Sequence, residues 1–421
     1  MKKVAKKSQR IKVGRKIVKV LEQRGAMDRE TRLALIQLSI PISLVAAVKE
    51  MKEEAEELGG QRYTRGKING PWGSNDGSIY LADQKVSVEV PRVRNRKTNQ
   101  EIPLPSYERL QHPGLIDEMA LKRVMKGISQ RDYEEAAVTM PATFGIKKNS
   151  VSRRFIKASG KKLREFLERD LSGYDFVAVV IDGKTYAGNQ IVVALGVTME
   201  GEKILLGFTE AKTENYEICK DFLKRLINRG LRDDQEILFV VDGAKGLRKG
   251  IKEVFGEMAF IQRCTWHKRE NVLRYLNRNQ QDYFRRKLQA AYEQPTYEKA
   301  KARLDAIRRE LKPLNESAVA SLDEGLEETL TIHKLGMFPK MGISFKTTNC
   351  LENVNKQLGR YTDRVDRWRT SDQRRRWIAS ALIYVEPRLR SVKGKEFLPT
   401  LRDMMRQARL ASNSQELKKA A

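Results

Sequence analysis

Short apolar runs in the middle of the chain indicate a series of buried strands. FVAVVID (176–182), IVVALGVTM (191–199) and EKILLGF (202–208) follow one another closely, and each has the length and β-branched content of a strand. Two further runs, EILFVVD (236–242) and AFIQRC (259–264), are separated from them and from each other by amphipathic helical segments. Three antiparallel strands followed by alternating helix and strand predict an α/β sheet.

Helical patterns surround this region. From about Trp266 to Gly342 the chain is charge-rich and contains no strand candidate, so we expect a helical insertion. The uncharged run from Leu33 to Val48 is interrupted by Pro41, which predicts a helix, a break and a second helix, followed by an acidic helix. The C-terminal segment is again helical and basic.

A small β module is expected before the α/β region. A Gly-rich break (59–77) precedes a segment (78–104) in which apolar and polar residues alternate, as in a hairpin. The turn RVRNRKTN is strongly basic, and a tip of this kind can lie against phosphates. The predicted DNA-contacting residues of this tip are Arg92, Arg94, Arg96 and Lys97.

A helix-turn-helix pattern lies between Gly127 and Leu171. Ser129 and Asp132 form a capping-box pattern, Gly145 is expected to make the turn, and Asn149 and Ser150 can cap a second helix. In such a module the start of the second helix meets base edges in the major groove. Two helices joined by a Gly turn are also common in proteins that bind no DNA. The residues predicted to contact DNA are Ser150, Ser152, Arg153 and Arg154.

The net charge of the chain indicates a negatively charged binding partner. Its 421 residues include 82 Lys and Arg against 54 Asp and Glu, a net charge of +28, which favours a polyanion such as double-stranded DNA. The longest uncharged run is too short to span a bilayer, and no secretory pattern is present. Three scattered cysteines form no disulfide framework, so a reducing cytoplasm is the expected location.

The Asp-Gly pair that ends the first strand run has two readings. Asp-Gly after β-branched residues is a strong hairpin signal, so Asp182 alone favours a turn. A second run also ends in Asp-Gly, at Asp242, but helical sequence follows it. Strand ends at the carboxyl edge of an α/β sheet are where active sites gather. Two carboxylates at one edge would repel unless a divalent cation lay between them.

Phosphodiester cleavage by two metal ions generally needs a third carboxylate. Glu352 is the candidate, since Thr347, Thr348 and Asn349 can begin a helix that carries Glu352 one turn in and Lys356 one turn further. A Glu near a helix start is more often a surface residue that complements the helix dipole. The segment GAKGLRKG lacks the Gly-Lys-Ser/Thr ending of a phosphate loop, so no nucleotide cofactor is expected.

Four motifs carry a resemblance to a known family. VIDGKTY, VVDGAKGL, CTWHKREN and TTNCLENVN, in this order, are similar to the Mutator-type insertion-sequence transposases of bacteria. These are ribonuclease H-like enzymes with an Asp-Asp-Glu triad. The resemblance covers roughly residues 127–361. GISQRDYEE and SVSRRF resemble the family's helix-turn-helix, and VEVPRVRN its upstream basic β segment.

The resemblance implies roles for individual residues. Asp182, Asp242 and Glu352 would be the catalytic metal ligands for two Mg²⁺ or Mn²⁺ ions. Cys264 and His267 match the family's Cys-x-x-His, which with Trp266 and Asn349 would support the active site. A zinc site is disfavoured, because His333 and Cys350 lack paired spacing. Further phosphate contacts are expected from the helix that carries Glu352 and from the segment after it: Lys356, Arg360, Arg364, Arg367 and Arg369.

The implied fold is an α/β ribonuclease H-like catalytic domain with an all-helical insertion, preceded by helical and small β DNA-binding modules. The implied function is a DNA transposase that binds terminal inverted repeats, cleaves and transfers strands, and acts as a homodimer on paired ends in the bacterial nucleoid. A DNA-binding regulator derived from a transposase and a structure-selective nuclease of the same fold are the alternatives. The expected segments are 1–60 (basic arm and helices), 61–110 (β module), 111–172 (helix-turn-helix region), 173–265 with 346–365 (catalytic domain), 266–345 (helical insertion) and 366–421 (basic C-terminal helices).

Overall fold

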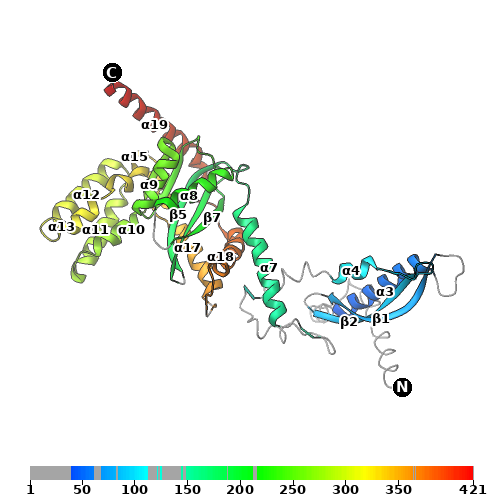
Figure 1. The fold of residues 1–421 in the computed structure, drawn as a ribbon. Coiled ribbons are helices and arrows are strands. Elements are labelled where there is room, and N and C mark those ends of the chain that lie inside the picture. Colours follow the sequence, from blue (N-terminus) through cyan, green and yellow to red (C-terminus); the bar gives the residue numbers. More distant parts are fainter. Residues whose placement is uncertain are drawn as a thin grey trace, which may run out of the picture. The chain divides into compact units, whose positions relative to one another are not determined.

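The computed structural model describes residues 39–60, 68–81, 84–111, 121, 124–125, 144–145, 148–186, 188–211, 216–363, 365 and 367–420. The chain divides into two compact units, Met1–Gly160 and Lys161–Ala421. Figure 1 shows the helices and strands of both units. No helix in the described part of the chain is both long enough and apolar enough to cross a membrane.

The first unit contains a long antiparallel hairpin packed against a helix. Strands β1 (Asn69–Leu81) and β2 (Gln84–Asn95) pair along their whole lengths, and α3 (Ser39–Gly59) packs on the hairpin. Met51, Ile79 and Val93 are central to their shared core. Two short strands, β3 (Glu101–Ile102) and β4 (Phe144–Gly145), add to β2, and α4 (Pro105–Gln111) follows β3.

Two expectations for this unit are wrong, and a third is tested only in part. The described part of α3 contains Pro41 and continues unbroken to Gly59, so no break follows Pro41, whereas the helix expected before Ser39 lies outside the described residues. The expected Gly-rich break is partly strand, since residues from Asn69 onward pair with β2 around a bulge between Pro71 and Ser74. Gly145 pairs with β2 instead of making a turn between helices. The helix expected at Ser129 and Asp132 lies outside the described residues.

The second unit is built on a five-stranded mixed sheet, as the apolar pattern predicted. Its strand order is β7-β6-β5-β8-β9, with β5, β6 and β7 antiparallel and β5, β8 and β9 parallel. Two helices, α8 and α9, pack on one face through a core that includes Ile181, Phe222, Phe239 and Ile251. The element bounds are β5 (Phe176–Tyr186), β6 (Asn189–Thr198), β7 (Lys203–Ala211), α8 (Tyr216–Asn228), β8 (Ile237–Val241), α9 (Lys245–Phe255) and β9 (Ala259–Arg263).

The predicted turn at Asp182-Gly183 is wrong. Strand β5 continues to Tyr186, and Asp182 and Gly183 pair with Val193 and Val192 of β6. The described residues place the reversal after Tyr186, where Gly188 adopts a positive φ of 74°. Strand β6 pairs with four residues of β5 beyond Asp182, and two of its partners there, Val192 and Ile191, are apolar and buried, so strand pairing outweighed the local Asp-Gly preference.

Residues 265–345 form helices and no strand, as predicted. They build a core of their own, centred on residues such as Leu288, Leu304 and Leu322. Helices α17, α18 and α19 follow this region. The bounds are α10 (Thr265–Leu273), α11 (Arg278–Tyr292), α12 (Tyr297–Leu311), α13 (Glu316–Asp323), α14 (Leu326–Thr329), α15 (Thr331–Lys334), α16 (Phe338–Phe345), α17 (Asn349–Thr362), α18 (Ser371–Val385) and α19 (Leu398–Ala420), and α7 (Lys148–Leu167) precedes the sheet.

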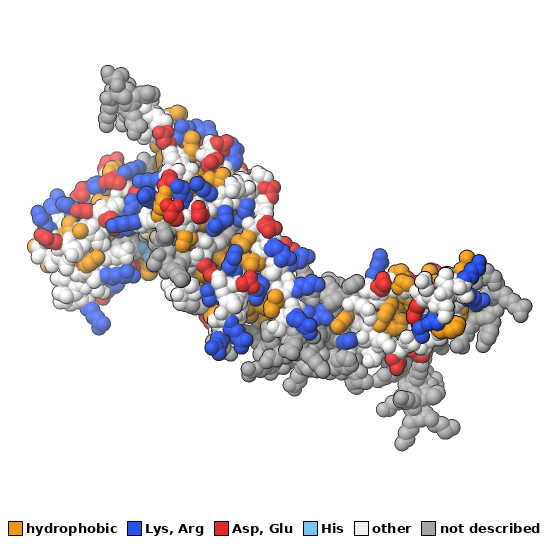
Figure 2. Space-filling model, viewed as in Figure 1, with side chains coloured by type: hydrophobic (Ala, Val, Ile, Leu, Met, Phe, Trp, Pro, Cys, Tyr) orange, Lys and Arg blue, Asp and Glu red, His pale blue; other side chains and the backbone are white. Residues whose placement is uncertain are grey.

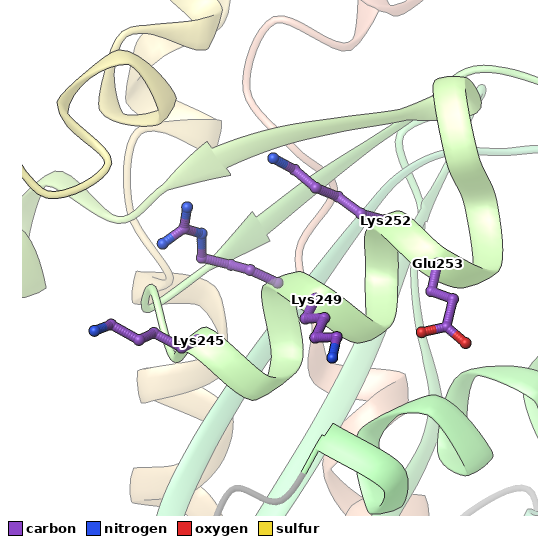
Figure 3. A pocket seen from close by; sticks show the side chains of 5 residues that line it. Lys245, Lys249, Lys252 and Glu253 are labelled. Carbon is purple, nitrogen blue, oxygen red and sulfur yellow. The ribbon is translucent and has the colours of Figure 1, made fainter.

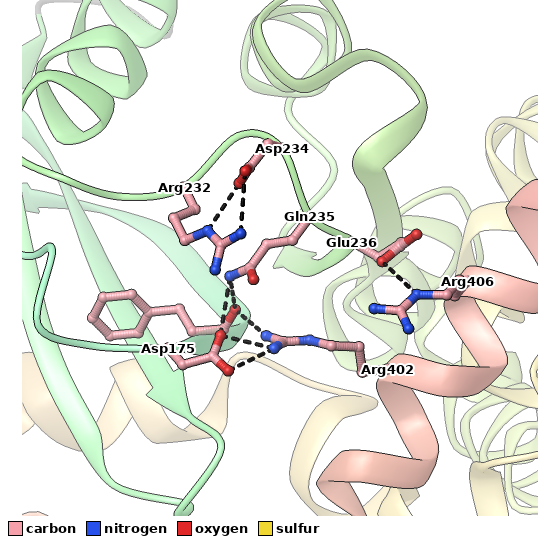
Figure 4. Close-up of polar contacts among 8 residues, drawn as sticks. Asp175, Arg232, Asp234, Gln235, Glu236, Arg402 and Arg406 are labelled. Atoms are coloured by element: carbon pink, nitrogen blue, oxygen red, sulfur yellow. Dashed lines mark hydrogen bonds and ion pairs between the residues drawn. The ribbon is translucent and has the colours of Figure 1, made fainter.

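Helix α19 closes the edge of the sheet at which β5 and β8 begin (Figure 4). Arg402 donates to both carboxylate oxygens of Asp175 at 2.7 Å and to the Phe176 carbonyl at 2.8 Å. Gln235, just before β8, also donates to Asp175, and the buried Glu236 accepts from Arg409 at 2.9 Å. The acidic side chains at this edge are therefore neutralised by arginines of the C-terminal helix.

Candidate active site

The register of the parallel strands brings Asp182 and Asp242 together at the opposite edge of the sheet. The pairing of β5 with β8 runs from Ala178 opposite Leu238 to Ile181 opposite Val241. Asp182 and Asp242 are each the next residue, so they occupy matching positions on neighbouring strands, whose usual separation is about 4.8 Å. The prediction that both carboxylates lie at one sheet edge is consistent with this register.

The two aspartates have different surroundings. Asp182 is buried, with 4% of its surface exposed, and it lies on the face opposite Ile181 because strand side chains alternate. Asp242 is half-buried, and its Oδ1 accepts from the backbone N–H of Ala244 at 3.0 Å, which holds the turn into α9. That turn requires Gly243, whose φ is 104°.

Helix α17 brings Glu352 toward the same region. The helix packs against β5, and Lys184 Nζ donates to the Asn355 carbonyl at 3.3 Å. Glu352 lies in the first turn and is half-buried; its Oε1 is buried and has no hydrogen-bond partner within the described residues. A buried carboxylate oxygen without a donor is costly unless a cation or a proton balances it.

The three carboxylates are on adjoining elements but are not gathered around one point. Among the residues that the structure describes, no three His, Cys, Asp or Glu side chains are grouped so that they could hold a metal ion. The triad of metal ligands therefore stays a prediction, supported by the strand register for Asp182 and Asp242 and by the contact of α17 with β5 for Glu352.

Cys264 contacts both the sheet and the start of α17. It follows β9 as Asp242 follows β8, and its N–H donates to the Val241 carbonyl at 2.7 Å. The fully buried thiol lies 3.7 Å from Thr348 Oγ1, and the next residue, Thr265, donates its N–H to the Lys346 carbonyl at 2.9 Å. Burial raises the pKa of the Cys264 thiol, so it is neutral at neutral pH. These contacts make Cys264 a packing residue between the sheet edge and α17.

Comparison with known proteins places the chain in a family. Residues 34–380 match the model of a family described as Transposase, Mutator family. The chain belongs to the Mutator family of transposases. The resemblance read from the four motifs is thereby confirmed.

Individual relatives are insertion-sequence transposases. The transposase for insertion sequence element IS905 of Lactococcus lactis subsp. lactis (strain IL1403) is 28% identical over 291 residues, covering 66% of this chain and 70% of the relative. The transposase for ISRM5 of Rhizobium meliloti (strain 1021) is 28% identical over 287 residues, covering 66% of this chain and 69% of the relative. A 30% identical stretch of 165 residues is shared with the transposase for IST2 of Acidithiobacillus ferrooxidans, covering 39% of this chain and 54% of the relative.

The other residues predicted to support the active site lie near the start of α10 and α17. Trp266 is 41% exposed, so it is not a core residue, and its ring meets that of His267 edge to face at 4.8 Å. His267 is half-buried, and its Nδ1 has no hydrogen-bond partner within the described residues. Asn349 is the exposed first residue of α17. An exposed Trp offers a stacking face for a base.

The basic residues predicted in the hairpin module are only partly available to DNA. Arg92 is held by Glu101 through two hydrogen bonds of 2.6 and 2.7 Å. Arg94 stacks over Trp72 at 4.8 Å and donates to Asn99. Arg96 and Lys97 are exposed in the turn between β2 and β3. The basic turn is where the sequence predicted it, but Arg92 and Arg94 also stabilise the module.

The predicted second helix of the helix-turn-helix exists as α7. It begins at Lys148 and contains Ser150; the side chain of Ser150 is outside the described ones. Ser152 is half-buried, Arg153 is exposed, and Arg154 stacks over Tyr80 at 4.9 Å. On α17, Lys356 and Arg360 are exposed one and two turns after Glu352, as expected.

The largest concentration of cations next to Asp242 is on α9. Lys245, Arg248, Lys249 and Lys252 extend from successive turns and, with Glu253, line an open pocket of about 570 Å³ (Figure 3). Lys245 pairs with Glu324, and Arg248 and Lys252 pair with Glu328. Basic and acidic side chains accordingly alternate on this part of the surface (Figure 2). The acidic partners offset most of the positive charge of this pocket.

Two buried cations at this edge were not predicted. The guanidinium of Arg263 packs so closely on Gly243 that a Cβ there would clash with Arg263 Nε, and its Nη1 donates to the Glu324 carbonyl at 2.6 Å. Lys268 is almost fully buried and donates to the carbonyls of Ser321 and Glu324 at the end of α13. Burial lowers the pKa of Lys268 to about 8. No local pattern reveals these residues, because their partners lie more than 50 positions away.

Proposed function

We propose that the chain is an insertion-sequence transposase that binds terminal inverted repeats and cleaves and rejoins DNA strands with divalent metal ions. The observation that carries the proposal is the strand register that puts Asp182 and Asp242 at matching positions of one sheet edge, in a chain of the Mutator family. The names of its relatives, which are insertion-sequence transposases, support the same conclusion.

The catalytic domain is proposed to have a ribonuclease H-like fold. Its supporting features are the order β7-β6-β5-β8-β9, the three antiparallel strands that come first in the chain, and the parallel β8 and β9 that follow. In this fold the helical residues 266–345 would be an insertion ahead of the helix that carries Glu352.

The side chains at the sheet edge fit a divalent cation by their chemistry. Asp182, Asp242 and Glu352 would hold two Mg²⁺ or Mn²⁺ ions, because carboxylate oxygens are the ligands that these hard ions prefer. The chemistry that two such ions supply when bound is activation of a water or a DNA 3′-hydroxyl and stabilisation of the leaving 3′ oxygen. The buried Glu352 Oε1 without a donor supports this assignment. The proposal requires Glu352 to approach the two aspartates.

Other residues of the chain would position the DNA. Lys356 and Arg360, exposed along α17, would bind phosphates beside the reacting bond, and Trp266 would stack against an unpaired base. Arg96 and Lys97 of the hairpin module and Arg153 of α7 would contact the terminal repeats. The transposase would act as a homodimer on two paired ends.

Two other functions use the same fold. A DNA-binding regulator derived from a transposase would have no need of three carboxylates, and all three are present in this chain. A structure-selective nuclease would cut branched DNA without preferring the ends of an element. Inverted repeats flanking the gene would favour the transposase over both alternatives.

A cleavage assay tests the proposal. The purified chain and a labelled duplex carrying the element's end should give Mg²⁺-dependent nicking at the element boundary. Asp182→Asn, Asp242→Asn and Glu352→Gln should each abolish nicking while the circular dichroism spectrum stays unchanged. If all three variants cut as the unchanged chain does, the triad is wrong. If the unchanged chain cuts branched duplexes and element ends equally, the nuclease alternative is favoured.

A further inference from the structure

A second groove runs along α17, beside the face that carries Glu352. Its volume is about 630 Å³, and it lies between α17, the end of α16 and the segment after α18. Its lining residues are Lys203, Ile343, Ser344, Thr347, Asn349, Cys350, Asn353, Gln357, Arg388, Leu389, Arg390, Ser391, Val392 and Lys393.

The charge of this groove is uncompensated. Four cations line it, Lys203, Arg388, Arg390 and Lys393, and its lining contains no carboxylate. In the described part of the chain none of the four forms an ion pair; Arg388 donates to the hydroxyl of Tyr361 at 3.3 Å. The pocket on α9 differs, because its cations pair with Glu324 and Glu328. A groove with four cations and no acid favours an anion with several charges.

The neutral polar groups of the groove form a row. Asn349, Asn353 and Gln357 are four residues apart, so they lie one above another on one side of α17. The row spans about 12 Å at 1.5 Å per residue. One DNA strand advances about 3.4 Å per nucleotide, so the row matches the length of three to four nucleotides. Amide and guanidinium side chains are common donors to phosphate oxygens.

The groove adjoins the candidate active site. Asn349 and Asn353 flank Glu352 in the sequence of α17. Cys350, two residues before Glu352 in α17, also lines the groove. A strand with one phosphodiester at the carboxylates would therefore have neighbouring phosphates within reach of the groove.

We propose that this groove binds the sugar-phosphate backbone of the DNA strand next to the phosphodiester that reacts, without regard to base sequence. The inference rests on the proposed transposase function. The same backbone chemistry belongs to two strands, the end of the element and the target DNA, and the test separates them.

The test measures how salt affects the affinity of the full chain for DNA, in Ca²⁺ so that no strand is cut. The double variant Arg390→Gln/Lys393→Gln removes two groove cations, and the matched control Lys245→Gln/Lys252→Gln removes two cations from α9. Each lost phosphate contact reduces the slope of log K against log salt by about one. The groove variant should therefore lower the slope by about two, and the control should leave it unchanged.

Comparing two DNA duplexes shows which DNA strand the groove binds. A slope reduction confined to a duplex that carries the element's end assigns the groove to the element's own strand. An equal reduction on an unrelated duplex assigns it to any strand that enters the site, target DNA included. An unchanged slope for the groove variant, or an equal reduction in the α9 control, overturns the proposal.

Lysine acetylation read by mass spectrometry locates the contact independently. Bound DNA should protect Lys393 and leave Lys245, whose side chain is 85% exposed, as reactive as in the free chain. Protection of Lys245 without protection of Lys393 would contradict the proposal. Neither binding measurement needs cleavage, so a chain that fails to cut element ends would disprove the proposed function while the groove is still tested.

Discussion

Both edges of the central sheet carry acidic side chains, but the surroundings of these side chains differ. Where β5 and β8 begin, Asp175 and Glu236 are neutralised by arginines of α19 (Figure 4). Where pairing between β5 and β8 ends, Asp182 and Asp242 lie at matching positions, and the nearby Glu352 has a buried oxygen without a donor. The first edge is closed by the contacts with α19, and at the second edge the carboxylates are the proposed metal ligands.

The two edges also differ in what their arginines contact. Arg402 is a clamp on the first edge, bound to Asp175 and to the Phe176 carbonyl. At the second edge the buried Arg263 packs on Gly243 and donates to the Glu324 carbonyl. Arg263 therefore supports the turn after Asp242 by packing on its glycine.

The largest expected stability effect comes from Arg263→Met. The substitution removes a donor from a buried carbonyl and the packing on Gly243, at a cost of about 3 kcal/mol. For a unit of this size that lowers Tm by roughly 6–12 °C. Arg309→Met, which changes an exposed arginine of α12, is the control and should cost less than about 0.5 kcal/mol. Equal Tm values for the two variants would show that Arg263 does not support this edge.

A smaller loss is expected from Arg402→Ala at the other edge. The variant loses the hydrogen bonds to Asp175 and to a buried carbonyl, which are worth about 2 kcal/mol together. Thermal unfolding should show a decrease in Tm of roughly 4–8 °C. Arg406→Ala on the same helix changes a side chain that is 55% exposed and lies 3.8 Å from Glu236, so it should have little effect. A Tm decrease for Arg406→Ala as large as for Arg402→Ala would contradict the clamp.

The smallest expected effect is a pH dependence of the free energy of unfolding, caused by Glu236. Burial alone would raise the pKa of Glu236, but hydrogen bonds from the backbone and Arg409 outweigh it and lower the pKa. A lowered folded-state pKa adds stability above the unfolded value of about 4.3, and that stability is lost as the pH falls through the folded-state pKa. Glu236→Gln should thus be less stable than the unchanged chain by on the order of 1 kcal/mol at pH 6, and the difference should shrink as the pH falls through the folded-state pKa of Glu236. Chemical denaturation at several pH values measures it, and a difference that grows in acid would contradict this account.

Much of the fold could be predicted from apolar runs because all five sheet strands are buried and contain few charges. The helices of residues 265–345 were predictable because this segment is charge-rich and contains no strand candidate. The end of β5 was not predictable, because the Asp-Gly signal is local whereas the pairing of Gly183 with Val192 depends on another strand. The run of β1 through a Gly-rich segment was missed for the same reason.

The candidate site was predictable only for the residues that lie in recognisable sequence motifs. Asp242 follows a recognisable strand, Glu352 lies in the first turn of a recognisable helix, and Asp182 lies in a motif that resembles the family's. The register that aligns Ile181 with Val241 is a long-range property. Arg263, Lys268 and the uncompensated groove beside α17 depend on residues far apart in the chain, so neither periodicity nor motif could reveal them.

The most direct test makes one substitution just before β5, at Asp175, and one where the pairing of β5 with β8 ends, at Asp182. Asp182→Asn should reduce Mg²⁺-dependent cleavage at the element end by about 10³-fold or more, because the ligand set supplies several kcal/mol of transition-state stabilisation. It should also remove the increase in Tm that Mn²⁺ gives the unchanged chain. Asp175→Asn should keep both the cleavage and the Mn²⁺ effect and lose only stability. Equal cleavage and an equal Mn²⁺ response for the two variants would contradict the assignment of Asp182 to the active site.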